Sequence, residues 1–241
     1  MKILNHSDLK TEKTLLQNGS VEVRFTRDEI PCPLYELKDK RAKICNINQL
    51  TIKDFETLTH TAALAEKILN LPDVSKVAIF SPENENQIII SCLLNSIVVT
   101  YSKITTSSGL RGKENLFLQH IKKHLTAEEL TLHRNIKHMR DKWLAHLDEN
   151  PYETAKTILV FDPSNESLPI LGHHVSYKTI SVEANFFAEF RNLATKILTI
   201  LKQKQNTDKA AFTFDEIKNL APTVRPLATD YLIYHKPESK S

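Results

Sequence analysis

Residues 125–150 read LTAEELTLHRNIKHMRDKWLAHLDEN and carry the clearest helix pattern in the chain. Thr126 and Glu129 have the spacing of a capping box, in which each side chain binds the backbone N–H of the other residue. Asn150 precedes Pro151, which ends the helix because proline disfavours helical backbone before it. Apolar residues recur every three or four positions, and we expect them to form one buried stripe: Leu132, Ile136, Met139, Trp143 and Leu147.

Two chemically useful side chains border this stripe. On a helix, Arg140 and His146 lie about 120° apart around the axis and about 9 Å apart along it. An imidazole exchanges protons near neutral pH, and a guanidinium grips phosphate oxygens with two hydrogen bonds. Asp141 would orient or polarise these neighbours. The alternative is structural, with Arg140 and His146 pairing with acidic side chains at a helix interface.

The pattern of Arg140, Asp141 and His146 resembles the signature of the HEPN superfamily of helical nucleotide-binding and ribonuclease domains. That signature is Arg, a polar residue, a short spacer and His. The surrounding residues 128–148 resemble the abortive-infection branch of AbiU type, and the likeness extends over roughly residues 50–205. The resemblance implies a cytoplasmic toxin or phage-defence endoribonuclease that uses no metal and no cofactor. These three residues would be its catalytic residues.

The resemblance also implies the chemistry and the partners. RNA would be cleaved by transesterification, because its own 2′-hydroxyl supplies the nucleophile. HEPN ribonucleases form homodimers, and the angle between Arg140 and His146 favours a two-fold cleft in which the arginine of one chain serves the histidine of the other. An antitoxin protein can be a further partner. The alternative function is a non-catalytic HEPN-like module that binds RNA or a protein.

Basic side chains gather around the motif. Residues 111–142 hold eight basic and four acidic side chains, which attracts phosphate if the basic ones share a surface. A solvated helix face is the alternative reading. A zinc site at His120 and His124 is a weaker alternative, because the neighbouring lysines would repel a cation. The expected RNA-binding residues are Lys122, Lys123, Arg134, Lys137 and Lys142.

Composition excludes several other classes of protein. The chain has 241 residues, 41% hydrophobic and 25% charged, with a net charge of +3. Its four glycines cannot build a phosphate-binding P-loop or a dinucleotide-binding loop. Three cysteines without C-x-x-C spacing are typical of reduced thiols in the cytoplasm. The sequence contains no run of 18 apolar residues, so we expect no membrane span.

The helix patterns predict an all-α, HEPN-like bundle. We expect an irregular N-terminal extension over residues 1–50, with a short helix at 9–17 and a strand at 21–25. The helical domain would cover residues 51–205, with helices starting at Thr51, at Ser81-Pro82, at Thr126 and at Ser181. The second of these would run through Asn86 to Thr106. A short hairpin or loop would precede the last long helix. Residues 206–241 would form a short helix, closed by Pro222, and a tail.

Overall fold

The computed structural model describes residues 9–71, 74, 83–105, 120–141, 153–162, 165–178, 185–210 and 214–235. Side chains are described within these ranges except at residues 153–162, 165–178, 208–210 and 214–218. The chain divides into two compact units. One comprises Met1–Lys43 with Thr207–Ser241, and the other comprises Ile44–Asn206. These limits differ from the expected divisions near residues 50 and 205.

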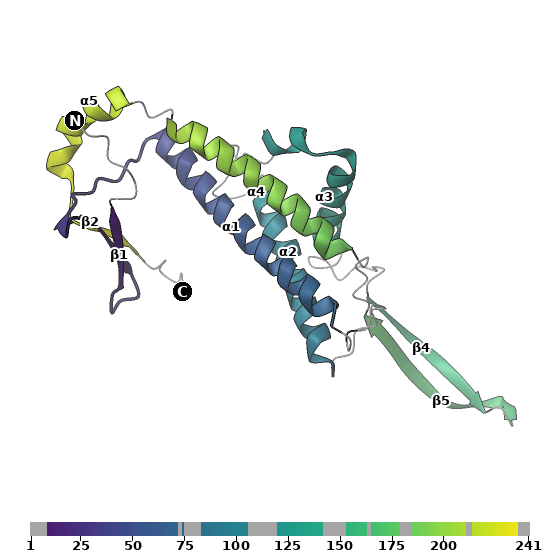
Figure 1. Cartoon of the computed structure of the whole chain (residues 1–241). Helices are drawn as coiled ribbons and strands as arrows, with labels where there is room; N and C mark the ends of the chain where they lie inside the picture. Colours follow the sequence, from purple (N-terminus) through teal and green to yellow (C-terminus); the bar gives the residue numbers. More distant parts are fainter. Residues whose placement is uncertain are drawn as a thin grey trace. The chain divides into compact units, whose positions relative to one another are not determined.

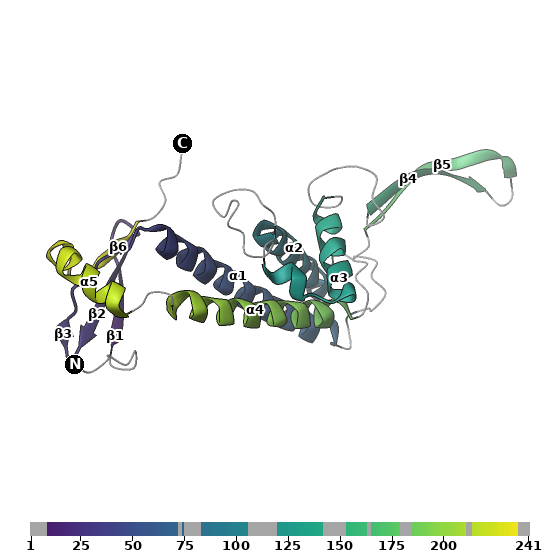
Figure 2. The same cartoon turned by 90° about the horizontal axis from the view of Figure 1, so that it is seen from above.

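Four long helices build the unit of residues 44–206, so the chain is mostly helical as predicted. In both views α1 and α4 run side by side, with α2 and α3 beside them (Figures 1 and 2). The 3-10 helix η4 (Lys122–His124) leads into α3. The helices are α1 (Lys40–Leu69), α2 (Glu85–Thr105), α3 (Ala127–Met139) and α4 (Phe186–Ala210).

Aromatic side chains from all four helices meet in the core. Tyr101 of α2 is 0% exposed and contacts Phe55 of α1, Phe190 of α4 and His133 of α3 in edge-to-face geometry. The ring centroids lie 5.5–6.1 Å from that of Tyr101. Such pairs stabilise a core by about 0.5–1.5 kcal/mol beyond the area they bury. Tyr101 of α2 therefore contacts each of the other three long helices.

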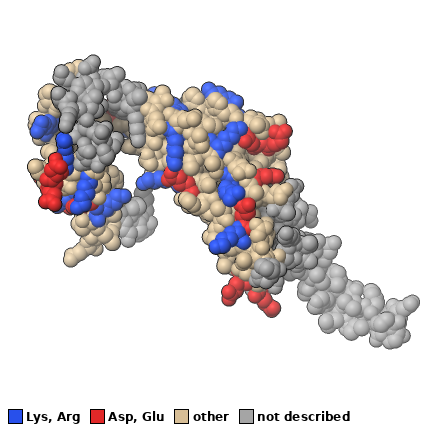
Figure 3. Space-filling view, viewed as in Figure 1, with Lys and Arg blue, Asp and Glu red and all other residues tan. Residues whose placement is uncertain are grey.

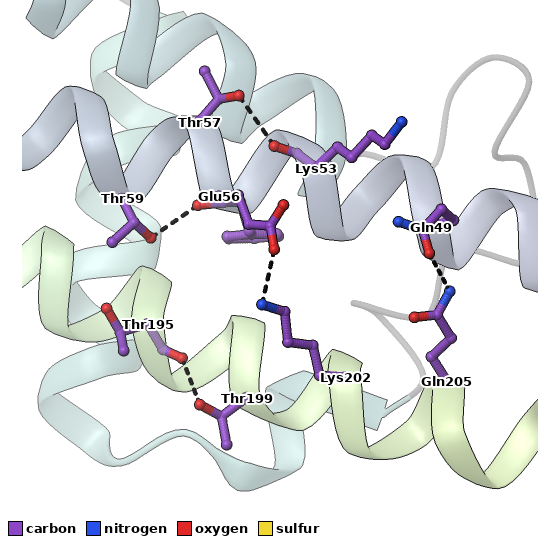
Figure 4. A network of polar contacts seen from close by, with 10 residues as sticks. Gln49, Lys53, Glu56, Thr57, Thr59, Thr195, Thr199, Lys202 and Gln205 are labelled. Carbon is purple, nitrogen blue, oxygen red and sulfur yellow. Dashed lines mark hydrogen bonds and ion pairs between the residues drawn. The ribbon is translucent and has the colours of Figure 1, made fainter. Parts of the chain in front are cut away.

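Polar contacts join α1 to α4 and show how the two helices are oriented, and Figure 4 draws some of them. Three contacts join the helices: Arg191 Nη1 to Glu66 Oε2 (3.1 Å), Lys202 Nζ to Glu56 Oε1 (2.8 Å) and Gln205 Nε2 to Gln49 Oε1 (2.6 Å). Residue numbers rise along α4 as they fall along α1, so the two helices are antiparallel. Exposed ion pairs of this kind each contribute about 0–1 kcal/mol.

Helix α3 begins where the sequence predicts. The backbone N–H of Glu129 donates to Thr126 Oγ1, and the N–H of Thr126 donates to Glu129 Oε2 at 2.7 Å, which completes the capping box. Glu129 also accepts from Lys196 Nζ of α4 at 2.6 Å. Ile136 and Met139 are buried as the stripe requires. Leu132 is half-buried, and Trp143 and Leu147 lie outside the described residues.

The first helix begins eleven residues before the predicted start at Thr51. Asp39 caps it, because Asp39 Oδ1 accepts from the backbone N–H of Ala42 at 2.7 Å. Thr51 instead donates its hydroxyl to the carbonyl of Ile47 within the helix, at 2.8 Å. The prediction was wrong because a threonine can bond backwards along a helix as well as cap one.

The all-α prediction is also wrong, because the other unit holds a four-stranded antiparallel sheet. The predicted helix at residues 9–17 is a strand, paired along its length with the correctly predicted strand that follows. The C-terminal β6 pairs with β2 as well, so residues from both ends of the chain share one sheet. The strands are β1 (Lys10–Leu15), β2 (Val21–Arg27), β3 (Ile30–Pro31) and β6 (Leu232–Tyr234).

The short C-terminal helix forms as α5 (Phe214–Val224), followed by the 3-10 helix η6 (Arg225–Leu227). Pro222 lies inside α5, so the prediction that it closes the helix was wrong. Pro222 has no backbone N–H to donate to the preceding turn, and the helix continues for only two residues beyond it. The predicted tail lies outside the described residues.

A hairpin precedes α4, as predicted, but it is long. It consists of β4 (Glu153–Asp162) and β5 (Asn165–Lys178), paired antiparallel from Glu153 opposite Lys178 to Val160 opposite Leu171. Extra residues on β5 shift the register beyond Val160. We predicted a short hairpin or loop because Pro169 and Gly172 are typical of loops. In the structure both residues lie within the bulged strand β5.

Helix α2 is long and apolar enough to cross a membrane, by length and composition alone. Half of its most apolar stretch is buried within the protein. The buried side chains include Leu94, Ile97 and Tyr101, which pack against the other helices. These residues thus belong to the core of the helical unit.

Candidate functional site around Arg140

Arg140 continues the helical backbone directly after α3. Its backbone N–H donates to the carbonyls of Ile136 and Lys137, which fixes the residue to the last helical turn. Its side chain is 45% exposed, and Nη1 lies 2.5 Å from Oδ1 of Asp141, whose side chain is 50% exposed. The sequence therefore places a solvent-accessible cation and a carboxylate together at the end of a capped helix.

The rest of the motif cannot be placed beside them. His146 and Lys142 lie outside the described residues, so their predicted roles stay predictions. The structure brings Arg140 and Asp141 together and leaves the position of the imidazole open. What these two side chains offer chemically is anion binding, because a guanidinium held by one carboxylate still has N–H groups that can donate to phosphate.

Four of the five predicted RNA-binding residues are described. Lys122 and Lys123 are exposed on η4, Arg134 is exposed on α3, and Lys137 is half-buried there. On the face shown in Figure 3, basic side chains over the helices stand among acidic and uncharged ones and form no continuous patch. This face therefore shows no basic patch that extends over several helices.

The pKa of His133 is lowered to about 4, first by burial and then by the positive charges of Lys137, Lys122 and Arg134. A like charge disfavours the protonated form of the imidazole. Lys122 belongs to η4, and Arg134 and Lys137 belong to α3.

Sequence reasoning missed the buried pair formed by His133 and Tyr101. The Tyr101 hydroxyl and His133 Nδ1 are 3.1 Å apart, and His133 is only 4% exposed. A neutral imidazole with its proton on Nε2 can accept from this hydroxyl. Burial raises the pKa of Tyr101, so the phenol keeps its proton. The available signal was spacing, because His133 precedes the buried Ile136 by three residues and shares its face.

The pKa shift of His133 makes the stability of the bundle depend on pH. Below about pH 6.5 the imidazole of the unfolded chain binds a proton that the folded chain refuses until about pH 4. The free energy of unfolding should therefore be highest above pH 6.5 and fall as the pH is lowered. We expect a loss of about 2 kcal/mol by about pH 5. Urea unfolding at about pH 7.5 and pH 5 measures it.

The matched control for this prediction is His133→Gln, which keeps a polar side chain and removes the titration. The variant should lose much less stability than the wild type between the same two pH values. Carboxylates contribute little in this window, because their pKa values lie near 4. An equal loss in both proteins would show that His133 does not cause the pH dependence.

Metal ligands do not gather in the part of the chain that has described side chains. No three His, Cys, Asp or Glu residues lie close enough there to hold a metal ion. The candidate zinc ligands His120 and His124 belong to this part of the chain, and so does the buried His133. The structure thus gives the alternative of a zinc site at His120 and His124 no third ligand among those residues.

Comparison with known proteins found no matching family model, no matching curated protein and no matching solved structure. The likeness to HEPN domains therefore rests on the motif residues themselves.

Proposed function

We propose that the protein is a metal-independent endoribonuclease of the HEPN type, acting in the cytoplasm as a toxin or abortive-infection effector. The observation that carries the proposal is the exposed pair of Arg140 and Asp141, held at the end of the capped helix α3. These are the first two residues of the motif, and His146 completes it in the sequence. The local cations Lys122, Arg134 and Lys137 supply attraction for an RNA backbone.

In the proposed reaction, His146 takes the proton from a ribose 2′-hydroxyl. The freed oxygen bonds to the adjacent phosphorus, and the bond from phosphorus to the 5′-oxygen breaks. That oxygen leaves as a hydroxyl after taking up a proton, and a 2′,3′-cyclic phosphate remains. Arg140 holds the phosphate oxygens and stabilises the charge that develops on them. Asp141 orients the guanidinium through their ion pair.

One observation favours the alternative, a non-catalytic module that binds RNA or a protein. Arg140 already has an ionic partner in Asp141, so the arginine has a structural explanation that requires no substrate. Thermal melts separate the two functions. If Arg140→Ala and His146→Ala each lower the free energy of unfolding by more than about 2 kcal/mol, the residues are structural. Near-neutral stability together with lost activity supports catalysis.

The direct experiment is to incubate the purified protein with mixed cellular RNA in the presence of EDTA. The proposal expects cleavage that rises with protein concentration and is unchanged by the chelator, because the nucleophile belongs to the RNA. Adding magnesium to a parallel reaction is the control. Intact RNA at a large excess of protein, or cleavage only with magnesium, would exclude a metal-independent ribonuclease.

A further inference from the structure

The hairpin of β4 and β5 has two edges of different character. On β5, the register shifts opposite Val160–Asp162, because Phe161 pairs with Pro169 and Asp162 with Asn165. Bulges and a proline, which has no amide hydrogen, prevent another strand from pairing there. Strand β4 has neither, and its residues follow one another without a bulge. Among the described residues, no strand pairs with the other edge of β4.

The composition of β4 suits strand pairing. Residues 157–161 read TILVF, which contains only β-branched, aliphatic and aromatic residues without a charge. A two-stranded hairpin alone is marginally stable in water, and a third strand or a packed face is needed for a stable sheet. An uncharged, regular edge of this length is the kind of edge that another chain extends.

We propose that β4 pairs antiparallel with β4 of a second copy, which gives a four-stranded sheet in the order β5-β4-β4-β5. Two identical antiparallel strands in one sheet are related by a two-fold axis normal to the sheet. That axis keeps each face on its own side, so facing residues must lie on the same face of their own strands. Two residues that face each other across the axis must therefore have numbers whose sum is even.

Charge complementarity selects one of these registers. With Leu159 on the axis, Lys156 faces Asp162 of the second copy, and the symmetric pair forms as well. Ile158 then faces Val160, and Thr157 faces Phe161. Cross-strand pairs of opposite charge and of apolar side chains both stabilise a sheet. Glu153 lies an odd number of positions from both Lys156 and Asp162, so no allowed register places it opposite either one.

The second copy is the occupant that this geometry fits, because β4 is complementary to itself. Both outer edges of this sheet are β5 strands, and each is interrupted only at Pro169 and the adjacent register shifts. The contact between the two β4 strands is isologous, because each copy contributes the same strand, so this contact closes with two copies. The inference uses no residue of the Arg140 motif, so it stands or falls independently of ribonuclease activity.

A charge exchange tests the register in the full chain. Lys156→Asp places two carboxylates opposite each other at both ends of the paired segment, and Asp162→Lys places two ammonium groups there. Each variant alone should associate at least about tenfold more weakly than the wild type in sedimentation velocity. An equimolar mixture restores both attractive pairs, so heterodimers should form with wild-type affinity. Ser176→Asp on β5, opposite the uncharged Ala155, is the control and should leave association unchanged.

A disulfide at position 159 tests whether the two-fold axis passes through Leu159. This test works even if the two copies also associate through another surface. Cys32, Cys45 and Cys92, none of which is buried, are first replaced by serine. Leu159→Cys in this background places two thiols opposite each other, within the separation that a disulfide bridges. It should oxidise to a covalent dimer at least about tenfold faster than Ser176→Cys, the control on β5. Circular dichroism checks that each variant folds.

Three results would overturn the proposal. The first is equal rates of crosslinking at positions 159 and 176. The second is a mixture of the two charge variants that associates no better than either variant alone. The third is a wild-type chain that stays monomeric at concentrations of about 100 μM, a range in which even weak specific complexes assemble.

Discussion

Replacing Tyr101 with alanine should lower the free energy of unfolding by about 3–5 kcal/mol. The side chain is fully buried and contacts Phe55, His133 and Phe190, so its removal leaves a cavity bordered by all four long helices. A loss of this size is a large fraction of the stability of an ordinary domain. Urea unfolding followed by circular dichroism at neutral pH measures it.

Two variants of the same helix show where this loss originates. Tyr101→Phe keeps the ring and removes the hydroxyl that meets His133 Nδ1, so it should cost only about 1 kcal/mol. Val99→Ala shortens a side chain that is 51% exposed and should change stability by less than about 0.5 kcal/mol. If Tyr101→Ala cost no more than Val99→Ala, the aromatic cluster would not be the centre of the bundle.

Arg140→Ala and His146→Ala should each reduce RNA cleavage by at least about a hundredfold, the usual contribution of a general base or of a positioned charge. The sequence predicts one continuous helix through both residues, on which they would lie about 120° and about 9 Å apart, so one phosphate would be hard for both to reach from the same chain. We expect the arginine of one chain to serve the histidine of the other. Heterodimers of the two variants should then regain one complete site and up to about half the wild-type activity.

The heterodimers are made by co-expression with two different affinity tags and purified through both. His138→Ala is the matched control, because His138 is an exposed histidine of the same helix and lies outside the motif. It should keep full activity. Verified heterodimers that remain inactive would contradict the trans arrangement, as would an active species that sediments as a monomer.

Local patterns predicted the helices well. The capping box of Thr126 and Glu129 forms as expected, because both of its partners lie within one turn of chain. The burial of Ile136 and Met139 follows from three-and-four spacing alone. Where two local alternatives compete, the sequence does not decide between them. Thr51 can cap a helix or bond backwards within one. Because residues 40–50 are already helical, Thr51 lies inside α1 and bonds backwards to Ile47.

Features that depend on distant residues could not be predicted. The small sheet needs Val21–Val23 to meet Leu232–Tyr234, and three residues at the end of a chain carry too little pattern to indicate a strand. The burial of His133 depends on Tyr101, which lies 32 residues earlier. In the candidate site, Arg140 and Asp141 form an exposed ion pair, and the predicted catalytic role of the motif stays a prediction. The relation of Arg140 to His146 depends on residues outside those described.

The chemical identity of the RNA ends tests the central claim most directly. A short synthetic RNA is incubated with the protein in EDTA, and the products are identified by mass spectrometry. Attack by the 2′-hydroxyl at a site built from Arg140 and His146 predicts a 2′,3′-cyclic phosphate on one fragment and a 5′-hydroxyl on the other, with neither formed by His146→Ala. Fragments that carry a 5′-phosphate and a 3′-hydroxyl, or cyclic ends that persist in the variant, would contradict it.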